Sequence, residues 1–346
     1  MTKTIVALML VLLFAAPVSA QEWTAPLPPD PALDLMPEAA DTFWEGVSQI
    51  LKNALPQLLP SFSECLRICC SIAAVAMLLA ILQTIPGTTE STAHLAGGAA
   101  ISILLLRSSN SLIALGAETV RSISEYGKQL LPIMTAALAG SGGTGTSAAL
   151  YAGTVFFDAI LGSLVSTVLI PLIYVFLCLS VAKCALGDSF LKKLSDFIKW
   201  VSTWCLKLVL YAFTGYISIT GVISGTADAA AIKATKLTIS GMVPVVGGIL
   251  SDASEAVLVS AGLIRSMTGV YGLLASASIC ILPFLQIGVQ YLLLQATGAV
   301  CDIFSDKRCV ELIRDFAWSM GMLLAMTGTG CLLVMVSVIC FMRGVG

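Results

Sequence analysis

Long stretches without a charged residue constrain this chain more than any other feature. They cover residues 68–89, 91–106, 129–157, 159–182, 208–227, 266–301 and 316–342. A helix needs about 20 apolar residues to cross the ~30 Å hydrocarbon core of a bilayer, and most of these stretches are long enough. Backbone groups inside a bilayer must be satisfied within the protein, which favours helices. We therefore expect an all-α, polytopic integral membrane helical bundle of about six to eight spans.

The charge content argues against the soluble classes of protein. Of the 346 residues, 11% are charged and 58% are hydrophobic, whereas soluble domains carry about 25% charged residues. The net charge is −2, and no dense Lys/Arg patch offers the electrostatic footprint that nucleic acid needs. A soluble enzyme, a disordered chain and a nucleic-acid binder are all disfavoured, and the lipid bilayer is the first partner expected.

The first 20 residues have the pattern of a secretory signal peptide. Lys3 precedes an apolar run at 5–16, Pro17 breaks the run, and Val18-Ser19-Ala20 supplies small residues for cleavage. Cleavage there would leave the N-terminus outside the cytoplasm. An uncleaved N-terminal anchor is the alternative.

Residues 21–65 are expected to form an extracytoplasmic lead-in to a membrane domain at 66–346. The prolines in 21–37 favour an extended linker. From 38 to 63, apolar residues at helical spacing predict an amphipathic helix on the membrane or on a partner, interrupted at Pro56 and Pro60. A simple lead-in to the first span is the alternative.

Lysine and arginine asymmetry predicts the orientation of the spans. The lysine-rich stretch 183–207, and the loop with Lys307, Arg308 and Arg314, should face the cytoplasm. With the N-terminus outside, six crossings follow, near 66–86, 92–107, 159–182, 208–226, 270–300 and 316–342. A broken helix or re-entrant hairpin is expected at 129–157, which contains a Gly/Ser/Thr run, and an external or re-entrant segment is expected at 228–265.

The chemistry of an enzyme is missing from the sequence. His94 is the single histidine, and the glycine run lacks the lysine of a phosphate-binding loop. The 11 cysteines form no CxxC pair, so a zinc site has little support. We expect no enzymatic activity, no cofactor and no metal, and any energy coupling would come from a partner.

Polar residues in apolar surroundings are the functional candidates, because charge inside a membrane is costly. They form an ion or substrate path, or a polar subunit interface, unless they lie at the membrane surface where charge costs little. Asp252 and Glu255 would share one helical face, and Arg265 could pair with a carboxylate. The candidates are Asp158, Asp252, Glu255, Arg265, Gly140, Gly142, Gly143 and Gly145.

Two segments carry a resemblance to a known family. The stretch 241–257, GMVPVVGGILSDASEAV, continuing to Gly272, and the stretch 128–134, KQLLPIM, before the glycine run, resemble the stage III sporulation protein AE family. The resemblance covers roughly residues 40–346.

The resemblance implies a membrane-embedded subunit of the sporulation channel, a secretion-like apparatus that links mother cell and forespore. It implies as partners other stage III sporulation membrane proteins, including a separate ATPase subunit and ring-forming subunits, and a location in the mother-cell membrane. Independently of the resemblance, the glycines in the spans allow helices to pack closely, which favours a tight bundle or a homo-oligomer. The competing hypothesis is an independent secondary transporter with a site at the broken helices.

Overall fold

The computed structural model describes the backbone of residues 25–37, 43–82, 90–242 and 247–343, and their side chains except those of 82, 90–95 and 221–261. The expected signal peptide, 1–20, lies outside these ranges. Every regular element that the model describes is a helix. The predicted all-α membrane class is therefore confirmed.

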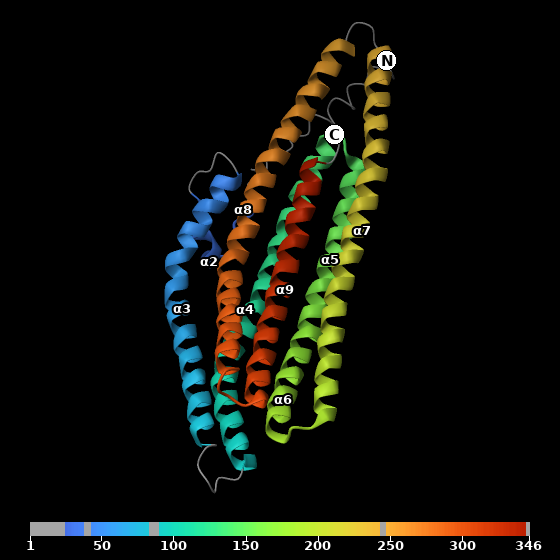
Figure 1. Cartoon of the computed structure of the whole chain (residues 1–346). Coiled ribbons are helices and arrows are strands. Elements are labelled where there is room, and N and C mark those ends of the chain that lie inside the picture. Colours follow the sequence, from blue (N-terminus) through green and yellow to red (C-terminus); the bar gives the residue numbers. More distant parts are fainter. Residues whose placement is uncertain (1–24, 38–42, 83–89, 243–246, 344–346) are drawn as a thin grey trace.

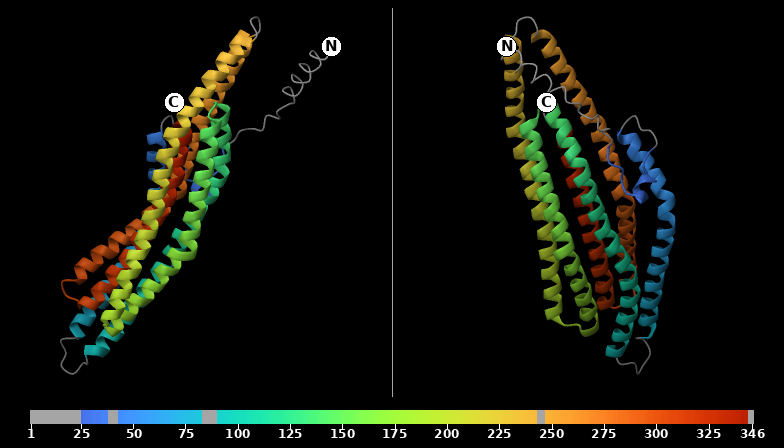
Figure 2. Two further views of the ribbon diagram at one scale, coloured as in Figure 1. Left: turned by 90° about the vertical axis from the view of Figure 1, so that its right-hand side faces the viewer. Right: turned by 180° about the vertical axis from the view of Figure 1, so that it is seen from behind.

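Long antiparallel helices make up the bundle (Figure 1). A single turn, α2 (Asp30–Leu33), precedes α3 (Phe43–Leu82) and α4 (Glu90–Gly140). The next helix consists of α5 (Thr144–Leu164), the π-helical turn η1 (Val165–Leu169) and α6 (Ile170–Leu186), and α7 (Ser189–Met242), α8 (Gly247–Cys301) and α9 (Lys307–Arg343) complete the chain. α9 packs against α4, α5, α6, α7 and α8. The views in Figure 2 show the helices running side by side along one axis.

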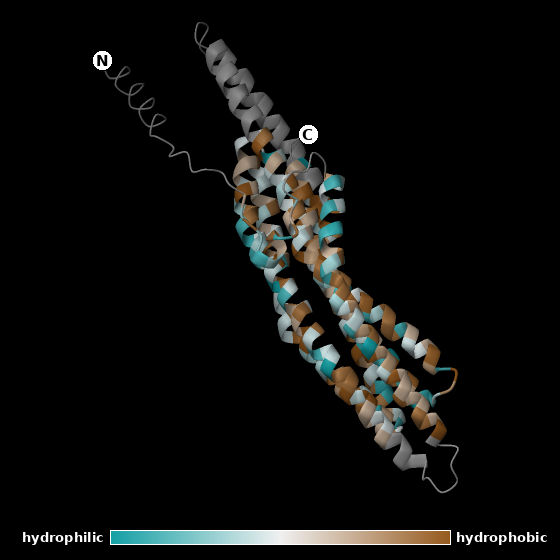
Figure 3. Ribbon diagram, turned by 90° about the vertical axis from the view of Figure 1, so that its left-hand side faces the viewer, coloured by the Kyte–Doolittle hydropathy of each residue, from teal (hydrophilic) through white to brown (hydrophobic). Residues whose placement is uncertain are grey.

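Five segments are long and apolar enough to cross a membrane: Phe43–Ile81, Ala96–Gly140, Thr144–Leu186, Gly262–Cys301 and Lys307–Arg343. Each overlaps one expected crossing. The sixth expected crossing, 208–226, falls in α7 and extends into side chains outside the described part. Figure 3 shows apolar residues along the whole described length of the helices, with hydrophilic residues between them.

α4, with 51 residues, is about 75 Å long by helical rise, well beyond the thickness of one bilayer.

The glycine run breaks the helix, as predicted, but in a tight hairpin turn. α4 ends at Gly140, and Gly143 N donates to Leu138 O at 3.0 Å to close the turn. Gly142 has φ 96°, a left-handed conformation that glycine adopts without steric cost. The run thus joins two antiparallel helices at one end of the bundle.

The predicted interruption at Pro56 and Pro60 is wrong, because α3 continues through both prolines. Each proline removes its own N–H from the helical ladder, and its ring crowds the carbonyl four residues earlier. The apolar helical pattern on either side is continuous, and α3 packs along α8 and α4. Tertiary packing therefore outweighs the lost hydrogen bonds.

A buried ion cluster ties α6, α7 and α9 together. The Asp315 side chain on α9 is 4% exposed, and its two oxygens lie 2.6 Å from Lys183 Nζ and 2.8 Å from Lys199 Nζ. Lys183 also lies 3.5 Å from Glu311. Lys199 sits 5.3 Å from the centre of the Phe176 ring, within cation–π distance. We call Asp315, Lys183 and Lys199 the Asp315 cluster.

Removing the shared carboxylate should destabilise the bundle. Asp315→Asn keeps the side-chain shape but removes the carboxylate that Lys183 and Lys199 share, and leaves Lys183 only its 3.5 Å contact with Glu311. Breaking a buried pair costs roughly 3 kcal/mol or more. The measurement is unfolding of the purified chain in mixed detergent micelles, followed by circular dichroism. Glu311→Gln is the control, since this half-exposed carboxylate should contribute below about 1 kcal/mol. Equal shifts for the two variants would contradict the assignment.

Candidate functional site

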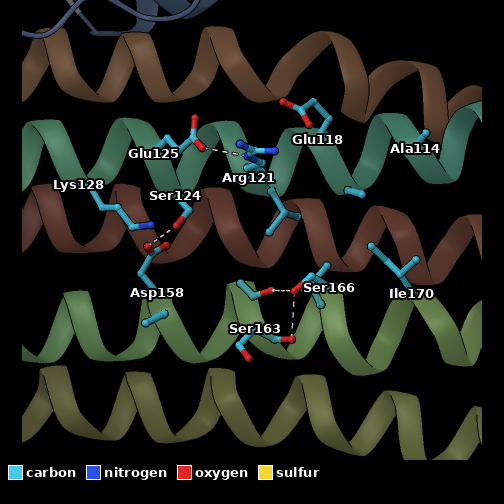
Figure 4. Close-up of a pocket in the computed structure, with 15 residues that line it drawn as sticks. Ala114, Glu118, Arg121, Ser124, Glu125, Lys128, Asp158, Ser163, Ser166 and Ile170 are labelled. Carbon is cyan, nitrogen blue, oxygen red and sulfur yellow. Dashed lines mark hydrogen bonds and ion pairs between the residues drawn. The ribbon is translucent and has the colours of Figure 1, made fainter.

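A cavity of about 700 Å³ opens between α4 and the continuous helix α5–η1–α6. We call it the Asp158 groove. Figure 4 shows the polar side chains of α4 on one side of it and those of α5 and η1 on the other. Its polar lining is Glu118, Arg121, Ser124, Glu125, Lys128, Asp158, Ser163 and Ser166.

The α4 wall of the groove follows from helical spacing. Glu118, Arg121, Glu125 and Lys128 recur every three or four residues and therefore share one face. Arg121 Nε donates to Glu125 Oε1 at 2.9 Å, one turn away on this face. The charged stripe lies on an otherwise apolar bundle, so its exposed edge marks a polar surface of the molecule.

Asp158 is the buried centre of the groove. Asp158 is 7% exposed. Ser124 Oγ on α4 donates a hydrogen bond to Asp158 Oδ2 at 2.5 Å. Figure 4 shows Lys128 directed toward the same carboxylate. One turn earlier on α5, Thr154 Oγ1 donates to Ser337 Oγ on α9 at 3.0 Å. A buried polar row on α5 thus links α4 to α9.

The opposite wall contains the π-helical turn η1, and the sequence explains its position. Pro171, in the first turn of α6, has no N–H, and its ring crowds the carbonyl four residues earlier. A wider turn directly before such a proline relieves that conflict, as π-bulges do within α-helices. Val165, Ser166 and Ile170 of this region line the groove, so the irregular turn lies beside the candidate site.

The predicted glycines and Arg265 form a second location. Arg265 Nη1 on α8 donates to Ser141 Oγ in the α4–α5 turn at 3.3 Å. Gly140, Gly142 and Gly143 belong to this turn, and Gly145 lies in the first turn of α5. Asp158 is about 22 Å further along α5 by helical rise. The structure therefore brings Arg265 to the glycines but keeps Asp158 apart from them.

Some predicted residues cannot be placed in either location. Asp252 and Glu255 lie on the helix α8, but their side chains are outside the described part, as is that of His94. Within the described ranges, no three His, Cys, Asp or Glu side chains converge on a point where they could hold a metal ion. Glu118, Arg121 and Lys128 were missed, although their spacing in 118–128 is a recognisable one-face pattern.

The groove offers the chemistry of one buried carboxylate between a hydroxyl donor and a lysine. Such a carboxylate can exchange a proton or a cation, or receive a polar group of a neighbouring subunit. Among the residues that line the groove, Asp158 is the one buried carboxylate, since Glu118 and Glu125 are exposed. These properties fit a polar path or interface in a membrane bundle.

Comparison with known proteins gives two matches. The family model for stage III sporulation protein AE matches residues 35–344. Stage III sporulation protein AE of Bacillus subtilis (strain 168) is 26% identical over 187 residues, which cover 54% of this chain and 46% of that protein. The chain thus aligns with about half the length of that relative. No solved structure matches the chain significantly.

The Ser124–Asp158 bond should contribute to stability. Ser124→Ala leaves the buried carboxylate without its hydroxyl donor, and a hydrogen bond to a charged group contributes about 1.5–3 kcal/mol. Unfolding in mixed micelles should reveal the loss. Ser163→Ala, at an exposed serine of the same groove, should stay within about 0.5 kcal/mol of the parent. An unchanged Ser124→Ala variant would show that the bond contributes nothing.

Proposed function

We infer that this chain, which belongs to the stage III sporulation protein AE family, is a membrane-embedded subunit of the channel complex that links mother cell and forespore. In this role it is required for endospore development and acts without enzymatic activity of its own. The observation that carries the proposal is the family match across residues 35–344, which spans all of the long helices. The family is named for sporulation rather than for a catalysed reaction.

The proposed location is the mother-cell membrane around the forespore, with the N-terminus extracytoplasmic. The charge distribution along the bundle supports this orientation. The α6–α7 and α8–α9 connections lie at the same end of the bundle (Figure 1), and Lys192, Lys193, Lys307 and Arg308 lie in or beside them. Basic residues gather on the cytoplasmic side of membrane proteins. The α4–α5 turn at the other end would then face the intermembrane space.

The proposed partners are the other stage III sporulation membrane proteins, including a separate ATPase subunit and ring-forming subunits. Helices longer than one bilayer support such an assembly, because their ends are available for contacts outside the lipid. The Asp158 groove is the proposed polar path or subunit interface. A homo-oligomer of this chain within the complex is compatible with the same surfaces.

A genetic test separates the role of the groove from that of the fold. Deletion of the gene in an endospore former should stop forespore development, and the parent gene should restore it. Asp158→Asn should restore spore counts poorly, because it removes the buried charge, whereas Glu125→Gln changes an exposed member of the same groove and should restore them. Normal spores after deletion would overturn the proposed function.

The same cells test the partners. The parent chain, isolated in mild detergent during sporulation, should carry other stage III membrane proteins with it. If Asp158→Asn is made in normal amounts but loses these partners, the groove is an interface. If it keeps them without supporting development, the groove is a path.

An independent secondary transporter remains the second candidate, favoured by the buried carboxylate in a cavity of about 700 Å³. It predicts coupled uptake of a solute by the purified chain in vesicles. Asp158→Asn should abolish that uptake, while Glu125→Gln should not. Absence of uptake, together with intact partner binding in cells, would count against it.

A further inference from the structure

A second cavity of about 700 Å³ lies between α3 and α4, away from the Asp158 groove. Two arginines line it, Arg67 from α3 and Arg107 from α4, together with one acid, Glu64. Neither guanidinium lies within ion-pair distance of a carboxylate among the residues that the structure describes. Two cations thus face one cavity together with a single acid that forms an ion pair with neither, an unusual excess of positive charge in so apolar a chain.

The cavity has further hydrogen-bonding groups and a closed back. Ser61, Ser108 and Ser111 line it. At its back, Gln286 on α8 donates from Nε2 to Ser61 Oγ at 3.2 Å. Guanidinium groups and hydroxyls together are the donors that phosphate oxygens accept, and arginine binds phosphate through two parallel bonds.

The position along the helices points to a membrane surface. Arg67 and Arg107 end the uncharged runs 68–82 of α3 and 91–106 of α4. By helical rise, Arg67 lies about 23 Å from the end of α3 at Leu82, and Arg107 lies about 26 Å from the start of α4 at Glu90. The connection between α3 and α4 joins these two helix ends. Since the hydrocarbon core is ~30 Å thick, both arginine backbones lie about 4–7 Å below the headgroups when that connection lies at the opposite surface, and a long arginine side chain reaches across this distance.

Below the arginines, both helices present apolar side chains outward. Met77, Leu78 and Ile81 of α3 are exposed, as are Ile103 and Leu106 of α4. A ligand that contacts the arginines and follows this surface needs a polar head and a long apolar tail. The cavity itself holds two positive charges and one negative charge, so a head with a single negative charge balances it.

We propose that the α3–α4 cavity binds the phosphodiester headgroup of a monoanionic membrane phospholipid. Arg67 and Arg107 hold the phosphate oxygens, the serines donate to the remaining headgroup oxygens, and the acyl chains lie against the exposed apolar faces of α3 and α4. Glu64 opposes the bound charge and limits the affinity. The site is independent of the proposed function, because it uses neither Asp158 nor a partner protein.

The test uses the full chain purified in detergent and native mass spectrometry with defined lipids. Dioleoyl phosphatidylglycerol should bind more tightly than the zwitterionic dioleoyl phosphatidylcholine. The double variant Arg67→Gln, Arg107→Gln should weaken phosphatidylglycerol binding about tenfold or more, since each arginine makes charge-assisted bonds. Arg314→Gln is the control, because this exposed guanidinium pairs with Asp302 far along the chain and should not change binding.

Two more variants separate the site from general effects on folding. Glu64→Gln should raise affinity for phosphatidylglycerol, a gain that a damaged fold would not produce. Arg67→Lys keeps the charge and loses the planar fork, so it should weaken binding less than Arg67→Gln. Circular dichroism and a single symmetric elution peak report the fold of each variant.

Competition with soluble anions identifies the source of the phosphate. Inorganic phosphate and glycerol 3-phosphate should not displace the lipid at concentrations where phosphatidylglycerol binds. If either displaces it, the site is one for a free phosphate and the lipid assignment is overturned. Equal binding of the two lipids, or full binding by a folded double glutamine variant, would overturn the site itself.

Discussion

One buried carboxylate, Asp315, sets the arrangement on which the rest of the bundle depends. It lies on α9, the helix that packs against five other helix segments, and it meets lysines from α6 and α7. These lysines are brought together by the short α6–α7 turn, where Gly187 has φ 69°. An ion pair of this kind adds little net stability over an apolar core, but one misplaced turn of α9 would take Asp315 away from the buried Lys183 and the partly buried Lys199. The cluster therefore specifies the register of α9 against α6 and α7.

α4 contributes polar residues to both of the cavities described above. One face of this helix carries the charged stripe of the Asp158 groove, and an earlier stretch supplies Arg107, Ser108 and Ser111 to the α3–α4 cavity. α4 can hold both because its 51 residues exceed what one bilayer needs. Its apolar first third lies beside α3, as does the stretch that follows with Arg107, Ser108 and Ser111, and its charged stripe lies further along the helix. A helix of ordinary span length would have to place the same charges in hydrocarbon, at several kcal/mol each.

The sequence predicts the helical membrane class and singles out Asp158 as a polar residue in apolar surroundings, because both depend on local information. An uncharged run predicts a span, and a lone acid within one predicts a buried polar group. Pairings between helices were out of reach. Lys183 and Lys199 were interpreted as markers of orientation, while the structure pairs both with Asp315. Arg67 and Arg107 are 40 positions apart in the chain, and only the packing of α3 on α4 shows that they share a cavity. The predicted helix break at Pro56 and Pro60 is wrong because the packing of α3 outweighs the tendency of proline to end a helix.

The glycine run and Asp158 are both candidates for a polar path or interface, and the structure places them apart, which changes where a functional path would lie. The glycines make a turn at the end of the bundle, a place where a break costs little and needs no function to explain it. The irregularity within the bundle is instead η1, the π-helical turn before Pro171. It lies in the wall of the same groove as Asp158, so a distorted backbone and a buried charge coincide there. Because π-bulges inside α-helices are frequent at functional sites, the centre of α5–η1–α6 is a better location for function than the glycine turn.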